Sequence, residues 1–106
     1  MSFDPMAAAI DWLDAYRAGD LDTILRMYAD NAVTDCSCCV KEIVTDKVRL
    51  RTFLAERLKD CGASDLDDLQ PIADGASVSY AAPNRVVHAI LEFGTDGKIV
   101  RMRWSD

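Results

Sequence analysis

Three of the four cysteines crowd into the segment Cys36-Ser-Cys-Cys39, and the fourth is Cys61. A reactive thiol needs a neighbour that lowers its pKa, and the only cation close by in the sequence is Lys41. A zinc site typically shows two Cys-x-x-Cys or His-x-x-x-His pairs, whereas this chain has a single histidine, His88. We therefore expect no metal site and no cofactor. Four free thiols, buried as small hydrophobic side chains, are the expected alternative to a reactive cluster.

A second set of residues could line a site for a small molecule. Aromatic rings and thioethers on apolar faces suit such a site, and the rings with a polar tip can also orient a ligand. The alternative for each of them is packing in the core, which is the role we expect for Tyr28. The candidates are Trp12, Tyr16, Tyr80, Met102 and Trp104, together with Ala89 on the same predicted face.

The elements that must position these residues begin with two helices. Asp4 can cap a helix that starts at Pro5 and closes at Gly19, with apolar residues recurring at helical spacing between them. A shorter helix follows at once, capped by Asp20, and Asn31 is the expected left-handed stop.

A third helix is predicted after a segment of short strand pieces and a turn over residues 32–44. Thr45 or Asp46 caps it, and Gly62 ends it. Its apolar stripe recurs at intervals of three and four residues and comprises Leu50, Phe53, Leu54, Leu58 and Cys61.

The rest of the chain has the texture of strands separated by short turns. Such short connections force antiparallel neighbours. Helices first and a meander afterwards predict an α+β fold, with three N-terminal helices packed on one face of a curved antiparallel sheet. The four predicted strands are Asp67–Ala73, Ser77–Ala82, Arg85–Phe93 and Lys98–Trp104.

Alternation along the last two strands predicts which face is buried. Val87, Ala89, Leu91 and Phe93 form the better core face of one strand, and Val100, Met102 and Trp104 that of the other. The opposite face mixes apolar and charged residues and favours an interface between two copies of the chain. His88 on this face is a candidate base, although no nucleophile for it is evident in the sequence. The alternative is a side chain that pairs with Glu92 or with a partner chain. The outer-face residues are Val86, His88, Ile90, Glu92, Ile99, Arg101 and Arg103.

Length and charge bound the classes of function. A chain of 106 residues fits one domain, residues 1–106, and half of its residues are hydrophobic. The net charge of −6 opposes contacts with phosphates, so nucleic acid and anionic membranes are poor partners. There is no apolar run long enough to span a bilayer and no signal-peptide pattern at the N-terminus, so a cytoplasmic location is expected.

The pattern Gly19-Asp-Leu-Asp22, joined to Tyr28-Ala-Asp-Asn-Ala32 and ending in Gly97-Lys-Ile-Val-Arg-Met-Arg-Trp104, resembles the nuclear transport factor 2-like superfamily. The resemblance extends from about residue 5 to residue 104 and is greatest to the SnoaL-like polyketide cyclase and ketosteroid isomerase branch. It implies a cone, in which the sheet curls around the first helix and the open end is a pocket. It also implies dimers that pack their outer sheet faces together.

The same resemblance suggests a chemistry. Isomerase-like members use a strand carboxylate as base, with a tyrosine and a protonated aspartate as oxyanion donors. The resemblance places the base at Asp35, the tyrosine position at Trp12 and the aspartate position at Ala89. Both of the family's donors are therefore absent. The cysteine-rich segment also replaces the proline and longer loop that often follow the base, and a surface or capping role for Asp35 is the alternative.

Two functions follow from these observations. The first is a small-molecule pocket protein of the SnoaL-like type that acts as an isomerase or cyclase on an apolar carbonyl compound, with Asp35 as base. The second is a non-catalytic dimer that binds a hydrophobic ligand or a protein partner in the same cone. Two titratable groups converging inside the pocket would favour the enzyme, and a fold of this kind hosts both functions.

Overall fold

The chain forms three helices and six strands in the part that the computed structural model describes, residues 4–36, 42–60, 63–83 and 85–105. No helix within these ranges is long and apolar enough to cross a membrane. The helices are α1 (Pro5–Ala18), α2 (Leu21–Arg26) and α3 (Lys47–Asp60). The strands are β1 (Tyr28–Cys36), β2 (Glu42–Val44), β3 (Leu66–Ile72), β4 (Gly75–Ala82), β5 (Arg85–Phe93) and β6 (Ile99–Ser105).

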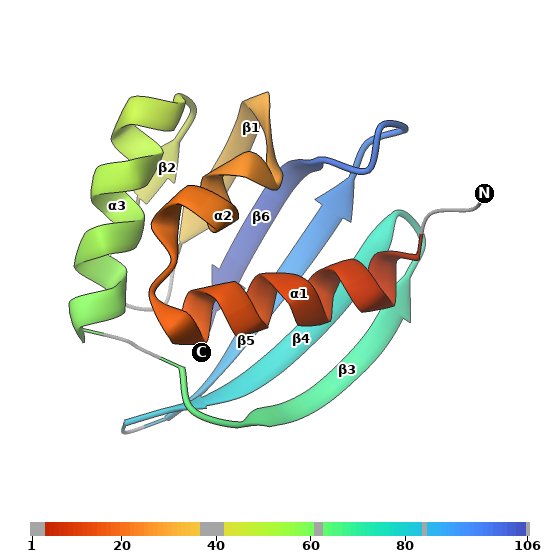
Figure 1. Cartoon of the computed structure of the whole chain (residues 1–106). Coiled ribbons are helices and arrows are strands. Elements are labelled where there is room, and N and C mark those ends of the chain that lie inside the picture. Colours follow the sequence, from red (N-terminus) through yellow and green to blue (C-terminus); the bar gives the residue numbers. More distant parts are fainter. Residues whose placement is uncertain (1–3, 37–41, 61–62, 84, 106) are drawn as a thin grey trace.

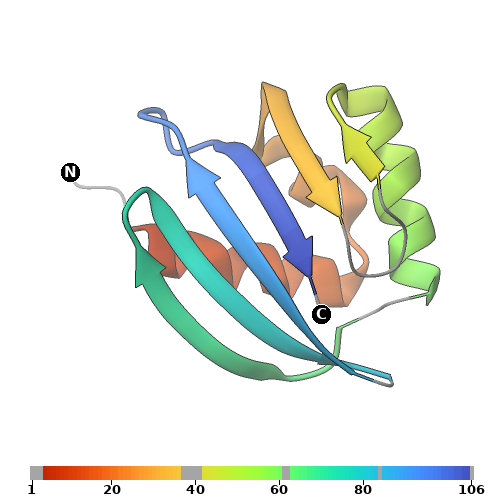
Figure 2. The ribbon, with the colours of Figure 1, turned by 180° about the vertical axis from the view of Figure 1, so that it is seen from behind.

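The strands form one sheet in the order β2-β1-β6-β5-β4-β3. All neighbours are antiparallel except β1 and β6, which run parallel. The sheet curves around α1, while α2 and α3 lie over the end of the sheet that holds β1 and β2 (Figure 1). Seen from behind, the other face of the sheet carries no helix (Figure 2). The predicted α+β fold with helices on one face is confirmed.

The helix starts are set by aspartate caps, as predicted. The Asp4 carboxylate accepts hydrogen bonds from two backbone N–H groups at the start of α1, and Asp20 accepts one from the N–H of Thr23 in α2. The Arg49 N–H donates to Asp46 over 2.8 Å at the start of α3. Gly19 closes α1 with a φ of 71°, a conformation that glycine adopts without steric cost.

The predicted left-handed stop at Asn31 is wrong. α2 ends at Arg26, Met27 stays right-handed, and β1 has already begun at Tyr28. The physical reason is the neighbouring strand: the Ile99 N–H donates to the Met27 carbonyl over 2.8 Å, so this stretch enters the sheet beside β6 immediately after the helix.

The prediction of which side chains are buried is confirmed in β5 and is wrong at the start of β6. Val87, Ala89 and Leu91 are fully buried. In β6, however, Ile99 is fully buried while Val100 is 37% exposed, the reverse of the prediction. Glu92 pairs with Arg101 and Phe93 with Ile99, so one residue of β6 has no counterpart in β5. Such a bulge reverses the side-chain alternation on one side of it.

Candidate functional site

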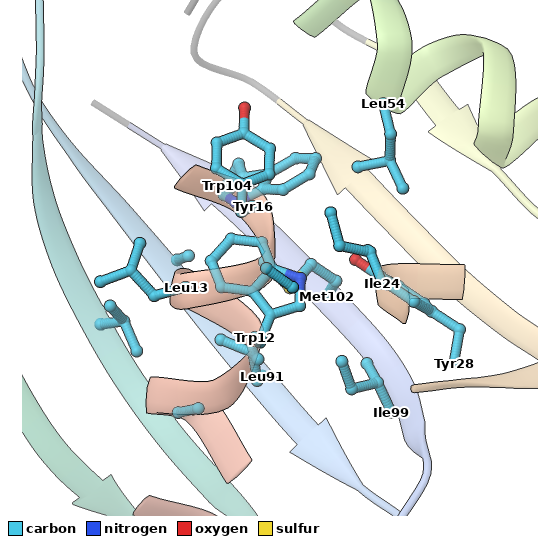
Figure 3. Packing of buried hydrophobic residues seen from close by; sticks show 14 of the residues in the cluster. Trp12, Leu13, Tyr16, Ile24, Tyr28, Leu54, Leu91, Ile99, Met102 and Trp104 are labelled. Carbon is cyan, nitrogen blue, oxygen red and sulfur yellow. The ribbon is translucent and has the colours of Figure 1, made fainter. Parts of the chain in front are cut away.

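An aromatic cluster fills the space between α1 and the concave face of the sheet (Figure 3). Trp12 and Tyr16 are one turn apart on α1, and their rings stack with centroids 5.1 Å apart. Tyr80 from β4 packs 5.9 Å from Tyr16, and Trp104 from β6 packs 6.0 Å from Trp12. The cluster therefore joins one helix to two strands that are distant in the sequence.

The structure brings together every residue predicted to line a pocket. Trp12, Tyr16, Tyr80, Ala89 and Met102 are fully buried, and Trp104 is 1% exposed. Ala89 lies directly opposite Trp104 in the sheet. These residues share one interior region, and their contacts with one another are those of a well-packed core. A role in lining a ligand site stays a prediction.

Several buried polar side-chain atoms lie in this interior, and three of them belong to α1 and β1. The indole nitrogen of Trp12, the hydroxyl of Tyr28 and the hydroxyl of Thr34 meet no partner at hydrogen-bond geometry among the described residues. Figure 3 shows the Trp12 nitrogen and the Tyr28 hydroxyl directed toward each other beside Met102. Burial raises the pKa of Tyr28 well above its usual range. The Trp12 indole N–H and the Thr34 hydroxyl lie close enough to the phenol to lower this pKa in part by hydrogen bonding, although none of these contacts reaches full hydrogen-bond geometry. The phenol is therefore neutral and keeps its proton.

A buried cation lies at the side of the aromatic cluster that faces α3. Arg57 is only 5% exposed, and its guanidinium carbon lies 4.1 Å from the centroid of the Trp104 ring. Phe53, one turn earlier on α3, stacks on the same tryptophan at 5.5 Å. A cation over the face of an indole is attracted by the ring's negative face, which offsets part of the cost of burial.

Arg57 acts on the phenols of the cluster. Burial and the neighbouring Tyr80 raise the pKa of Tyr16 well above its usual range, while the positive charge of Arg57 lowers it in part. The same charge also acts on the pKa of Tyr28. Tyr16 and Tyr28 therefore stay protonated near neutral pH.

Arg57 and Thr34 were not among the residues predicted from the sequence, and only Arg57 stands at a position that could have indicated it. Arg57 follows Phe53 by four residues and Leu54 by three, so it continues the apolar stripe of the helix with a charge. That position alone distinguishes it from exposed arginines such as Arg51. Thr34 left no comparable signal, because the face of β1 that it occupies depends on the neighbouring strands.

Asp35 does not share a face with the aromatic cluster. Its neighbour Thr34 is 1% exposed and is paired with the buried Met102 of β6. Asp35 is half-buried and is paired with Arg103, which is exposed. Because successive side chains of a strand point to opposite faces, Asp35 projects toward the outer face of the sheet. Its predicted role as a base thus has no support from the interior groups.

The outer face also holds His88, which forms a contact other than the one predicted. Its Nδ1 lies 2.6 Å from the hydroxyl of Ser79, directly across the β4–β5 pair. Glu92, the predicted partner, instead lies 4.0 Å from Arg101. His88 is exposed, and the ring nitrogen shares a hydrogen with the serine in either direction.

The structure does not describe the side chain of any cysteine. Cys38, Cys39 and Cys61 lie outside the described residues, and Cys36 is placed only by its backbone at the end of β1. Their predicted free state stays a prediction.

An open groove lies apart from the aromatic cluster, between α2 and α3. Its volume is about 300 Å³, and it is lined by Leu21, Arg51, Thr52, Ala55, Glu56 and Lys59. Arg51 and Asp22 form an exposed ion pair of 2.8 Å nearby. None of the predicted pocket residues lines this groove.

Comparison with solved structures shows which proteins share the fold of this chain. No protein-family model matches the sequence, and no curated protein matches it. A SnoaL-like protein of unknown function from Burkholderia thailandensis is similar in structure, with a TM-score of 0.81 and 21% sequence identity over 94% of this chain and 92% of that one.

Two further solved structures are similar over most of the chain. An uncharacterised cystatin fold protein from Novosphingobium aromaticivorans matches with a TM-score of 0.76 and 20% identity over 99% of this chain and all of that one. The epoxide hydrolase/cyclase-like enzyme SalBIII, which has a role in pyran ring formation in the polyether salinomycin, matches with a TM-score of 0.73 and 22% identity over 92% and 85% of the two chains. These likenesses show the fold, and the predicted α+β fold with a curved sheet is confirmed.

Proposed function

We propose that the interior between α1 and the sheet binds a small, largely apolar molecule that carries an oxygen acceptor such as a carbonyl group. The observation that carries the proposal is the trio of buried polar groups, Trp12, Tyr28 and Thr34, which lie near one another but reach full hydrogen-bond geometry with no described residue. Most buried polar groups in proteins are paired, and groups that are not paired need an explanation.

The chemistry of the trio favours an acceptor over a donor. The indole N–H of Trp12 can only donate, and the hydroxyls of Tyr28 and Thr34 can donate or accept. A ligand oxygen near all three would satisfy the indole and at least one hydroxyl. The surrounding rings and Met102 would contact the apolar body of the ligand, which is the usual construction of a small-molecule site.

The fold is compatible with this proposal but does not select it. A structural neighbour, SalBIII, is described as an epoxide hydrolase/cyclase-like enzyme, and the same fold hosts unrelated functions. Isomerase or cyclase activity on a carbonyl compound with Asp35 as base is the catalytic form of the proposal. Binding without turnover is the alternative, and the position of Asp35 beside Arg103 favours it.

Intrinsic fluorescence can test binding, because both tryptophans of the chain belong to the aromatic cluster. Titration with a panel of cycloalkanones, from cyclopentanone to 4-tert-butylcyclohexanone, should change the emission, whereas the matching hydrocarbons should bind more weakly. Thr34→Val should weaken ketone binding several-fold because it removes one polar group of the trio. Thr95→Val, in the exposed turn before β6, is the matched control. No response to any ketone in the panel would contradict the proposal.

We further propose that the helix-free face of the sheet joins two copies of the chain (Figure 2). Val86 is 41% exposed there, and it lies near the partly buried Ile90 and the charged Glu92 and Arg101. Ile99 no longer contributes, because it is buried in the core. Sedimentation at micromolar concentration should give twice the mass of the chain, and Ile90→Asp should give a folded monomer. A monomeric parent protein would contradict this interface.

A further inference from the structure

We infer that a proton controls the interface between two copies of the chain, and that the dimer dissociates when His88 gains this proton. The inference rests on the interface proposed above for the helix-free face of the sheet and adds regulation to it (Figure 2). It begins from the observation that the single histidine of the chain lies on this face, between two of the apolar residues that would meet the second copy.

The position of His88 on β5 gives the first step. The alternation of the strand places it between Val86 and Ile90 on the outer face. Val86 is 41% exposed, Ile90 is partly buried and His88 is exposed. Side chains two residues apart on a strand lie roughly 7 Å from each other. A second copy that covers Val86 and Ile90 therefore covers the imidazole ring as well and removes it from water.

The hydrogen bond to Ser79 gives the second step. The Ser79 hydroxyl lies 2.6 Å from Nδ1 of His88, and Ser79 is only 6% exposed, so the bond holds the ring against the sheet. In the neutral ring this bond satisfies Nδ1 and leaves only Nε2 to be paired. The protonated ring keeps the bond, with Nδ1 as the donor, but it also carries a charge that a serine cannot neutralise. The two protonation states therefore differ in charge rather than in the anchoring of the ring.

The residues beside His88 do not offset this charge. Directly opposite it lie Ser79 in β4 and Ser105 in β6, and both are uncharged. The nearest charged position of β6 on this face is Arg103, which is paired with Ile90, the next outer-face residue of β5. The diagonal neighbour of the histidine is therefore a cation, and a proton on the ring adds a like charge.

The acidic residues of the same face are farther from the histidine. Glu92 lies two outer-face positions along β5 and is 4.0 Å from Arg101. Asp68 belongs to β3, so β4 separates it from the histidine. Asp35 belongs to β1 and is paired with Arg103. Among the described residues of this face, no carboxylate lies directly opposite or diagonal to the ring.

The symmetry of a dimer fixes the sign of the effect. A two-fold interface presents the same face of the second copy, so it removes two imidazole rings from water in a contact that already contains arginines from both copies. A protonated ring is hydrated in the monomer and desolvated in the dimer, so the monomer binds the proton more tightly. By linkage, lowering the pH through the range in which histidine gains its proton shifts the equilibrium toward the monomer.

The net charge of the chain makes this sign informative. Each chain carries a charge of −6 at pH 7 with a neutral histidine, so two copies repel each other at long range. One added proton per chain reduces this repulsion, and the net charge alone therefore predicts a tighter dimer at lower pH. The local position of His88 predicts a weaker one. Most carboxylates stay ionised above about pH 5.5, so they do not imitate the effect in the range tested.

Sedimentation equilibrium of the full chain at about pH 7.5 and about pH 5.5, at constant ionic strength, measures the dissociation constant of the dimer. We expect this constant to be at least about tenfold larger at the lower pH. His88→Gln keeps a polar side chain that does not titrate, so it should be a dimer at both pH values. Asp68→Asn removes an acid of the same face and should keep the tenfold step. The urea midpoint at each pH shows whether each variant is folded.

The outcomes separate this inference from the proposed interface. If the parent protein is a dimer whose dissociation constant is unchanged or smaller at the lower pH, or if the step persists in His88→Gln, the proton inference is overturned and the interface stands. If His88→Gln is a folded monomer, His88→Phe decides, because it restores a neutral ring. Loss of the dimer in both variants would overturn the inference, since a neutral side chain would then not suffice. A parent protein that is monomeric at both pH values would show that the interface and its control by a proton are both wrong.

Discussion

The indole nitrogen of Trp12 and the phenolic hydroxyl of Tyr28 face each other in the interior, yet neither reaches hydrogen-bond geometry with a described residue. Trp12 belongs to α1, and Tyr28 is the first residue of β1. The helix and the sheet therefore fix the positions of the two groups independently. Each is at most 1% exposed. Leaving such groups without partners costs stability, and this cost links the fold to its proposed function.

Tyr28→Phe should therefore raise the stability of the protein without ligand. Removing a buried hydroxyl that has no partner relieves a desolvation penalty of roughly 1 to 3 kcal/mol. Urea unfolding should show a higher midpoint with an unchanged slope. Thr34→Val should act in the same direction, because Thr34 is also buried without a partner among the described residues. A loss of more than about 1 kcal/mol in both variants would show that these hydroxyls are paired.

Gly75→Ala should destabilise the fold severely. A Cβ at this position would lie 1.8 Å from the carbonyl oxygen of Leu91, which belongs to the backbone of the paired strand and cannot move away alone. Forcing β4 and β5 apart should cost about 3 kcal/mol, at the upper end for overpacking. Gly94→Ala is the control, since its nearest neighbour is the flexible side chain of Val100 at 3.0 Å. Equal losses in the two variants, measured by thermal unfolding, would contradict the expected clash.

The sequence was most informative where a local rule decides the structure. Asp4, Asp20 and Gly19 have the capping roles predicted for them, because a cap depends on residues only a few positions away. The alternation of β5 was equally readable, since each of its neighbours is adjacent in the sequence. The aromatic cluster could be assembled from these faces alone.

The sequence was least informative where distant segments meet. The extra residue in β6 appears only when that strand is paired with β5, so the burial of Ile99 could not be predicted from its own strand. The orientation of Asp35 depends on its parallel pairing with Arg103, which is 68 residues away in number. Arg57 continues the apolar stripe of α3, but the sequence does not show whether a charged residue at such a position is buried or exposed.

The cap at Asp20 should make stability depend on pH in the acid range. A hydrogen bond from the Thr23 hydroxyl, followed by one from the Thr23 backbone N–H, lowers the pKa of Asp20 in the folded state. A group whose pKa is lowered by folding stabilises the protein above its unfolded pKa, and this contribution is lost as the pH falls through the folded pKa.

Asp20→Ala should therefore lower the urea midpoint near neutral pH, and the difference from the parent protein should narrow toward about pH 3. Asp20→Asn is the matched control, because asparagine caps helices but does not titrate. A difference between the alanine variant and the parent that stays constant across this range would show that the charge of Asp20 does not contribute.

The last prediction concerns catalysis: the protein should show little or no ketosteroid-isomerase-type activity, and Asp35→Asn should leave ligand binding in the interior unchanged. Asp35 lies on the face of β1 that it shares with Arg103, opposite to the face of Thr34, so a ligand contacting Trp12 would be out of its reach. The side chain of Ala89, where the resemblance to ketosteroid isomerases would place the donor acid, can donate no hydrogen bond. Losing one oxyanion donor costs roughly 10² to 10³ in rate. An ultraviolet assay of double-bond migration in a β,γ-unsaturated ketone measures the activity, and fluorescence titration of the same variant measures binding. Efficient turnover that Asp35→Asn abolishes would show that Asp35 reaches the substrate after all, and that the interior donors serve an enzyme rather than a binding protein.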